Sequence, residues 1–98
     1  MTRKLKTAEQ MERHFKGMAN HHRINILLLV DKASGITLED MADRLKANFK
    51  TISQHSRYLN QAGLIRKKYS GRTMEHSLSP YGKIFVKFIK AFQNSTTF

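Results

Sequence analysis

The 98-residue sequence contains no cysteine, few carboxylates and no long apolar run. Without cysteine, the chain forms no disulfide bond, no thiolate metal site and no thiol redox switch. No apolar run approaches the ~20 residues that cross a bilayer, and the opening MTRKLKTAEQ lacks the apolar middle of a signal peptide. We therefore expect a soluble, cytoplasmic protein that does not enter a membrane.

Enzymes and metal proteins are also disfavoured by what is missing. The 7 Asp and Glu residues lie mostly where helices are expected to begin, which capping explains, and no glycine-rich phosphate loop is present. Of the 5 histidines, the adjacent His21 and His22 would project about 100° apart on a helix. No HxxxH or HxxH pair lies near a carboxylate. We expect no catalytic residue, no metal site and no cofactor.

Positive charge is what the sequence has in excess. The 18 Lys and Arg residues give a formal net charge of +11. Because the length allows one domain with one modest core, this charge is concentrated on a small surface that attracts polyanions. The excess of positive charge indicates a nucleic acid as the partner, and we expect no binding to a membrane.

Capping signals and apolar periodicity predict two helices in the first third of the chain. Thr7 and Gln10 resemble a capping box that begins a helix over about 7–18. Asn20 or His21 then caps a helix that is apolar nearly all round, as expected at the centre of a core. After this helix, Ile36 is expected to form a brief extended segment.

Two further helices follow in close succession. Thr37 caps the first of them, which ends near Lys46, and Asn48 caps the second, which spans about 49–61. The spacing of Phe49, Ile52 and Leu59 predicts that these side chains point inward. A polar and basic outer face remains on the second helix.

The last third of the chain predicts a hairpin and a final helix. Residues 65–78 alternate as two strands joined by a turn at Ser70-Gly71, with Tyr69 on the inner face. Ser79-Pro80 then begins an apolar helix. The order helix, helix, short strand, helix, helix, hairpin, helix is that of a winged helix-turn-helix, mostly α with a small β-hairpin. We expect this domain over 7–92, a flexible N-terminus over 1–6 and a tail over 93–98.

The helix over 49–61 is the predicted recognition helix, whose outer face would enter the major groove of double-stranded DNA. Gln54 could pair with adenine, and Arg57 with guanine or a phosphate. His55 would face either the core boundary or a phosphate, and for the whole set the alternative is a solvated helix face. The candidate DNA contacts are Lys50, Thr51, Ser53, Gln54, His55, Arg57 and Asn60.

The hairpin adds a second set of candidate DNA contacts. Arg66, Lys67, Lys68 and Arg72 surround its turn and suit a minor groove or the phosphates beside it. The same charges would protect an edge strand from pairing with another sheet, and both roles are compatible.

Two segments resemble ArsR-type repressors: MANHHRINILLLV resembles their second helix, and TISQHSRYLNQAGLIRKKYSGRTMEHSLS their recognition helix and wing. The resemblance covers about residues 11–80. It implies a dimeric, sequence-specific transcriptional repressor that dimerises through its first and last helices. Ser56 stands where the family usually has leucine. The final helix carries Lys83, Lys87 and Lys90 instead of the His and carboxylate pairs with which some members sense metals.

The apolar faces of the first and last helices exceed what one small core requires, so we expect a homodimer bound to an inverted repeat. The alternatives are that these helices only cover the monomer's own core, that the chain is a non-specific architectural or RNA-binding module, or that it binds an acidic protein. On DNA, the protein would be associated with the nucleoid. The predicted interface residues are Met11, Phe15, Met18, Phe85, Phe88, Ile89 and Phe92.

Overall fold

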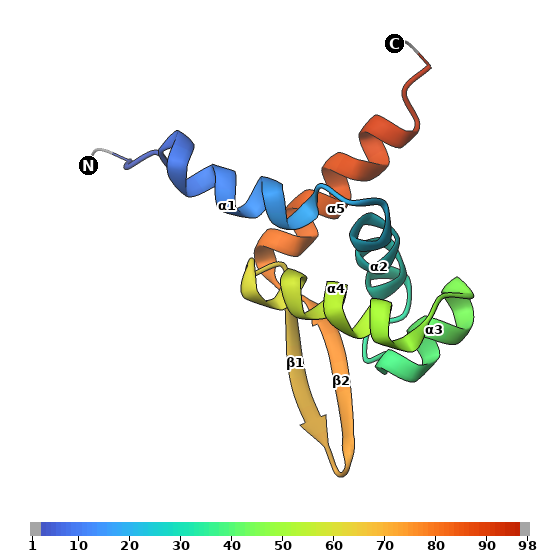
Figure 1. Cartoon of the computed structure of the whole chain (residues 1–98). Helices are drawn as coiled ribbons and strands as arrows, with labels where there is room; N and C mark the ends of the chain where they lie inside the picture. The colour runs from blue at the N-terminus through green and yellow to red at the C-terminus, as the bar shows by residue number, and fades with distance from the viewer. Residues whose placement is uncertain (1–2, 97–98) are drawn as a thin grey trace.

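The computed structural model describes residues 3–96. Over this range the chain forms five helices and one antiparallel hairpin (Figure 1). Met1, Thr2, Thr97 and Phe98, which belong to the two predicted tails, lie outside the described residues. The elements are α1 (Ala8–Met18), α2 (His21–Lys32), α3 (Leu38–Leu45), α4 (Phe49–Gln61), β1 (Ile65–Ser70), β2 (Thr73–Leu78) and α5 (Pro80–Gln93).

Each helix begins at a side-chain cap. At α1, the Thr7 amide donates to Gln10 Oε1 (2.9 Å) and the Gln10 amide donates to Thr7 Oγ1 (3.2 Å), which is the predicted capping box. Asn20, and not His21, caps α2. The predicted caps of the other helices are confirmed at Thr37, Asn48 and Ser79.

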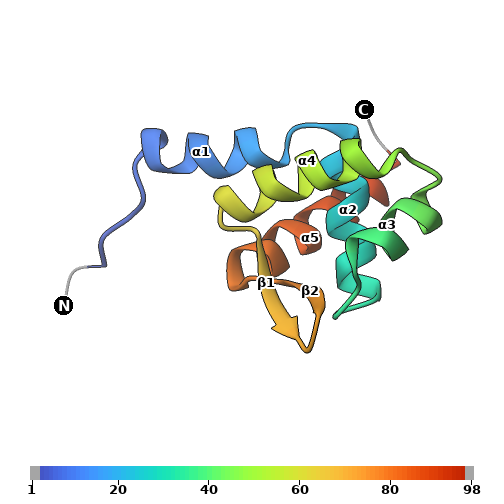
Figure 2. The ribbon, with the colours of Figure 1, turned by 60° about the horizontal axis from the view of Figure 1, so that its bottom comes forward.

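Helix α2 lies at the centre of the fold, as predicted. It contacts α1, α3, α4, α5 and β2, and Ile26, Leu27 and Val30 are completely buried. Figure 2 shows α1 and α4 side by side along one face of the molecule, and these two helices are in contact. Helix α4 therefore rests on a packed base formed by α1, α2 and α3.

The hairpin is anchored to the core at one end and free at the other. Ile65 pairs with Leu78 at its base, where both are buried, and Ser70 pairs with Thr73 at its tip. The turn residues are Gly71 and Arg72, one position later than predicted, and Gly71 has a φ of +64°. We call residues 65–78 the wing.

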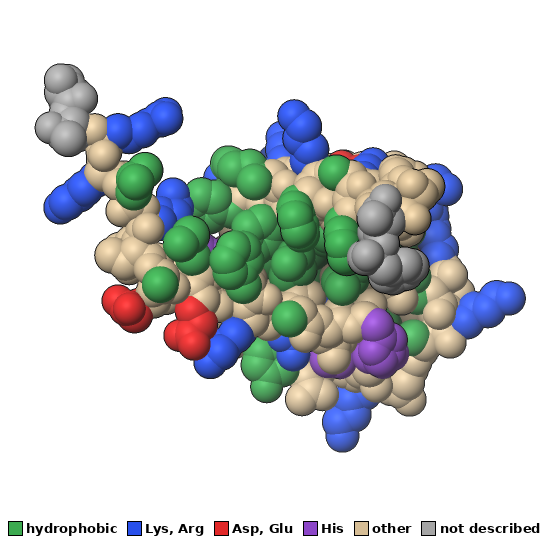
Figure 3. All heavy atoms as spheres, turned by 90° about the horizontal axis from the view of Figure 1, so that it is seen from above, with side chains coloured by type: hydrophobic (Ala, Val, Ile, Leu, Met, Phe, Trp, Pro, Cys, Tyr) green, Lys and Arg blue, Asp and Glu red, His purple; other side chains and the backbone are tan. Residues whose placement is uncertain are grey.

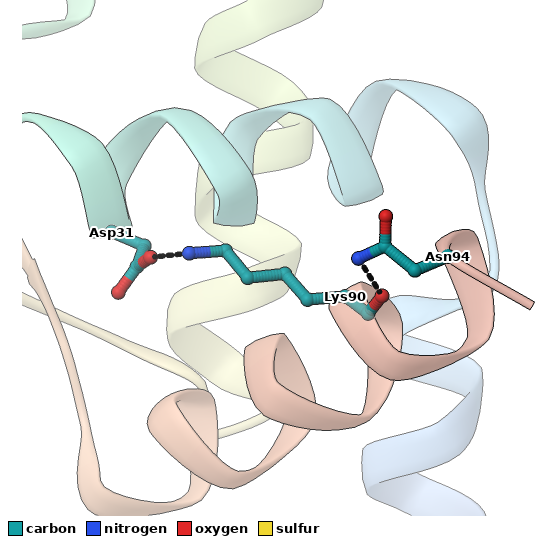
Figure 4. A network of polar contacts seen from close by, with 3 residues as sticks. All are labelled: Asp31, Lys90 and Asn94. Carbon is teal, nitrogen blue, oxygen red and sulfur yellow. Dashed lines mark hydrogen bonds and ion pairs between the residues drawn. The ribbon is translucent and has the colours of Figure 1, made fainter.

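Two polar contacts fix the ends of the core helices. Lys90 Nζ lies 2.7 Å from Asp31 Oδ2 and joins α5 to α2, and Asn94 Nδ2 donates to the Lys90 carbonyl at 2.8 Å (Figure 4).

Helix α5 extends to Gln93, so the first residue of the predicted tail is helical.

Candidate nucleic-acid interface

Helix α4 is held at both ends by hydrogen bonds. At its start, Asn48 Oδ1 accepts hydrogen bonds from the amides of Lys50 (2.8 Å) and Thr51 (3.3 Å). At its end, the Gln61 carbonyl accepts from the Arg13 guanidinium, and the Ala62 carbonyl accepts from His14 Nδ1 at 2.7 Å. Because a carbonyl only accepts, this contact fixes the proton of His14 on Nδ1. Helix α1 therefore satisfies the carbonyls that α4 leaves unpaired.

The inner face of α4 is buried by Ile52, Ser56 and Leu59, each with no exposed surface. Ser56, where the ArsR-type resemblance expects leucine, has a buried hydroxyl without a hydrogen-bond partner among the described residues. The position is thus an inward one, as the resemblance implies, although the residue is polar.

The outer face of α4 presents the predicted polar residues to solvent. Lys50, Gln54 and Arg57 are exposed, and Thr51 and Ser53 are half-buried. Gln54 and Arg57 line a shallow hollow of about 210 Å³ on this face. Among the described residues, neither side chain forms a hydrogen bond or an ion pair, and both face solvent.

His55 differs from the rest of the predicted set. Its Nδ1 accepts a hydrogen bond from Arg23 Nε at 3.2 Å, and its ring stacks on His22 with centroids 5.0 Å apart. Burial lowers the pKa of His55, and the charge of Arg23 lowers it further, with smaller contributions from His22 and His21. His55 thus faces α2 at the core boundary, the first of its two predicted alternatives.

Asn60 also has a structural contact. Its Nδ2 donates to the Ile65 carbonyl at 3.1 Å and ties the end of α4 to the first residue of the wing. This side chain therefore positions the wing relative to α4, although it was predicted as part of the DNA-contacting face.

The predicted cations of the wing, Arg66, Lys67, Lys68 and Arg72, are all exposed. The wing projects away from the helices (Figure 1). Its base is fixed by Ile36, whose carbonyl accepts hydrogen bonds from both the His76 amide (3.0 Å) and His76 Nδ1 (2.9 Å). The predicted extended segment at Ile36 is confirmed as a bridge to His76.

His76 is completely buried, and its Nε2 has no hydrogen-bond partner among residues 3–96. Burial lowers its pKa. The hydrogen bond to the Ile36 carbonyl opposes this shift, and the charge of Lys67, its partner in the hairpin register, adds to it. The neutral form is therefore the one that the folded wing accommodates.

Two aromatic predictions are wrong. Phe49 was expected to point inward and is 50% exposed, and Tyr69 was expected on the inner face of the hairpin and is 70% exposed. Phe49 is the first residue of α4, where the packed part of the helix has not yet begun. Tyr69 lies near the tip of the wing, beyond the reach of the core, which ends at Ile65.

Sequence reasoning missed two arginines that support α4. The Arg23 guanidinium lies 4.6 Å from the centre of the Tyr58 ring, and Arg13 reaches the helix end. Both lie more than 30 residues from their partners, and no local pattern reveals a contact over that separation.

Helices α1 and α5 expose a broad apolar surface (Figure 3). The rings of Phe15 and Phe85 stack at 5.6 Å and those of Phe88 and Phe92 at 6.1 Å. Among the predicted interface residues, Ile89 is buried in the monomer's own core, and Met18 and Phe85 are half-buried. We define the apolar face as its exposed members Met11, Phe15, Ile84, Phe88 and Phe92.

Within residues 3–96, no three His, Asp or Glu side chains are arranged so that they could hold a metal ion. None of the helices in that range has the length and apolar character of a membrane span.

The sequence matches no model of a protein family and no curated protein. Solved structures do match. HlyU from Vibrio cholerae N16961 is 22% identical with a TM-score of 0.80, over 91% of this chain and 97% of that one. Mb0332 from Mycobacterium bovis, a homodimeric winged helix-turn-helix DNA-binding domain described as a possible ArsR-family regulator, is 18% identical with a TM-score of 0.82, over 100% and 94%.

The chain has the winged helix-turn-helix fold. A further match is FabT of Streptococcus pneumoniae in complex with DNA, at 15% identity and a TM-score of 0.68, over 87% of this chain and 66% of that one. The predicted fold class is thereby confirmed, with α3 and α4 as the helix-turn-helix and residues 65–78 as its wing.

Proposed function

We propose that this winged helix-turn-helix is a sequence-specific regulator of transcription that binds double-stranded DNA, and that it acts as a homodimeric repressor of the ArsR type. One observation carries the proposal: the capped helix α4 presents an uncovered polar and basic face beside a wing with four exposed cations. A helix of this kind fits the major groove, and a basic hairpin fits the minor groove or its phosphates.

The two surfaces have different tasks in this proposal. Gln54 and Arg57 lie on one face of α4 three residues apart, and their side chains can each form two hydrogen bonds to a purine edge. The wing cations bind phosphates, which gives affinity and fixes the position of the protein without selecting a sequence. Lys50, Thr51 and Ser53 contact the backbone beside the groove.

The test compares a duplex enriched from a random pool with a scrambled duplex of the same composition. The wild-type protein prefers the enriched duplex by about 10³ or more. In the variant Gln54→Ala/Arg57→Ala, this preference falls by about 30-fold or more, because each lost base contact costs about 1–3 kcal/mol. The control Lys83→Ala/Gln93→Ala removes similar groups from α5 and keeps the preference.

Two results would contradict the proposal. If the wild-type protein binds both duplexes, or an RNA duplex, equally well, the chain is a non-specific module. If the double variant keeps the full preference, a surface other than the outer face of α4 reads the DNA.

The apolar face supports the homodimer. Five large apolar side chains lie exposed together on α1 and α5, and a surface of this kind is usually covered by a partner. A second copy would cover it symmetrically and place two α4 helices about 34 Å apart, one turn of DNA. An inverted repeat in the operator follows from that symmetry.

Sedimentation tests the dimer. The 11.4 kDa chain should sediment at about twice its mass at micromolar concentration, and Phe88→Asp should sediment as a monomer because it places a charge in the interface. Lys87→Asp, on the neighbouring position of α5, should remain dimeric. A wild-type monomer at that concentration would remove the dimer from the proposal.

A further inference from the structure

A groove of about 340 Å³ lies between the tip of the wing and the start of the helix-turn-helix. Tyr69, Arg72 and Met74 line it from the wing, and Leu38, Glu39 and Phe49 line it from the helices. The two aromatic residues that sequence patterns place in the core are therefore exposed on opposite walls of one groove.

Phe49 is half exposed although it belongs to a well-packed helix. It is the first residue of α4, directly after the Asn48 cap, and the buried face of the helix begins at Ile52. The first residues of a recognition helix are those that reach base edges in the major groove. A phenylalanine at this position has no hydrogen bond to offer a base.

One group on the major-groove edges suits such a side chain. The C5-methyl of thymine is the apolar contact available there, whereas the other groups are hydrogen-bond donors and acceptors. Covering Phe49 with this methyl removes apolar surface of both partners from water.

Charge orients a DNA strand in the groove. Arg72 on the wing attracts phosphate, and Glu39 at the start of α3 repels it, so the phosphates would lie on the wing side. The strand that separates the major groove from the minor groove must pass between α4 and the wing if each occupies its groove.

We propose that Phe49 is a specificity-determining residue that contacts a thymine methyl in each half-site, while Tyr69 and Arg72 close the groove over the adjoining strand. This inference rests on the proposed function and names one base that α4 selects. It assigns a direct role in base recognition to Phe49, although its helical spacing with Ile52 and Leu59 predicts that it points into the core.

The test removes only the methyl group. Each thymine of the enriched duplex is replaced in turn by deoxyuridine, in both half-sites together, and binding is measured by fluorescence anisotropy. At one position, the wild-type affinity falls by about 16-fold, because burial of one methyl is worth about fourfold in each half-site. At thymines outside the two half-sites, deoxyuridine changes nothing.

Variants assign the effect to Phe49. Phe49→Ala and Phe49→Gln bind the thymine duplex more weakly and no longer distinguish deoxyuridine, and Phe49→Leu retains part of the penalty. The control Gln54→Ala, on the same face of α4, binds more weakly but keeps the full penalty. Thermal unfolding followed by circular dichroism verifies that each variant is folded.

The inference fails if the wild-type protein binds every deoxyuridine duplex as well as the thymine duplex, or if the Phe49 variants keep the full penalty. In both cases the preference of the wild-type protein for the enriched sequence would survive. A wild-type protein with no preference for any sequence would instead overturn the proposed function itself, so the two failures are distinguishable.

Discussion

Removal of two wing cations should change how steeply DNA binding depends on salt. Arg66 and Arg72 are the best choice because neither is paired with a carboxylate across the hairpin, whereas Lys68 pairs with Glu75 in the register. Each phosphate contact contributes about 0.9 to the slope of log K against log salt. Arg66→Gln/Arg72→Gln removes four contacts from a dimer, so the slope becomes shallower by about 3.6.

This change is large enough to measure without difficulty. A fourfold rise in salt should cost the wild-type protein about 150-fold more affinity than it costs the variant. The change should be the same for enriched and scrambled duplexes, because phosphate contacts carry no sequence information. The preference between the two duplexes should therefore survive.

The assay is fluorescence anisotropy of a labelled duplex at several KCl concentrations. The control Lys83→Gln/Lys87→Gln removes the same charge from α5, outside the surface formed by α4 and the wing, and should keep the wild-type slope. Equal slopes for the wing variant, the control and the wild-type protein would refute the placement of the wing on the phosphates.

Three further predictions concern stability. Gly82→Ala should destabilise the fold by about 3 kcal/mol and lower Tm by about 12–24 °C, because a Cβ there would lie 2.0 Å from the Leu64 carbonyl oxygen. In the control Gly71→Ala, the added Cβ meets open space, so the loss of stability should be only about 1 kcal/mol. Equal losses for the two variants would contradict this. Because the pKa of His76 is lowered in the folded protein, the unfolded chain binds more protons below about pH 6.5. The free energy of unfolding, measured with urea from about pH 8 to pH 5, should therefore decrease as the pH falls below that value. His76→Gln should reduce that dependence, and a variant with the full wild-type dependence would contradict the assignment. Asp31→Asn should cost no more than about 1 kcal/mol in urea denaturation, because its ion pair with Lys90 is partly exposed, and a larger loss would show that the pair stabilises more than its exposure indicates.

Local signals were sufficient to predict most of the fold. A cap acts within three residues of itself, so Thr7, Thr37 and Asn48 could be recognised without knowledge of the neighbouring helices. The near-continuous apolar run of α2 predicted its central position because no solvent-facing stripe was left. The exposure of the wing cations was likewise predicted from the local sequence around the hairpin turn.

The incorrect predictions arose where tertiary contacts decide the outcome. Phe49 precedes Ile52 by three residues, and helical spacing therefore predicts that both point inward. Ile52 is buried, but Phe49, at the very start of α4, is left half exposed. Tyr69 alternates correctly with Ile65, yet the hairpin extends beyond the core. The contact between Arg23 and His55 joins residues 32 positions apart, which no local pattern encodes.

The central claim is that α4 selects a DNA sequence. Selection of bound duplexes from a random pool by the wild-type protein tests this most directly. We expect an enriched inverted repeat whose half-sites are centred about 34 Å apart, one helical turn. A pool that binds in a salt-dependent manner yet enriches no sequence would contradict the claim.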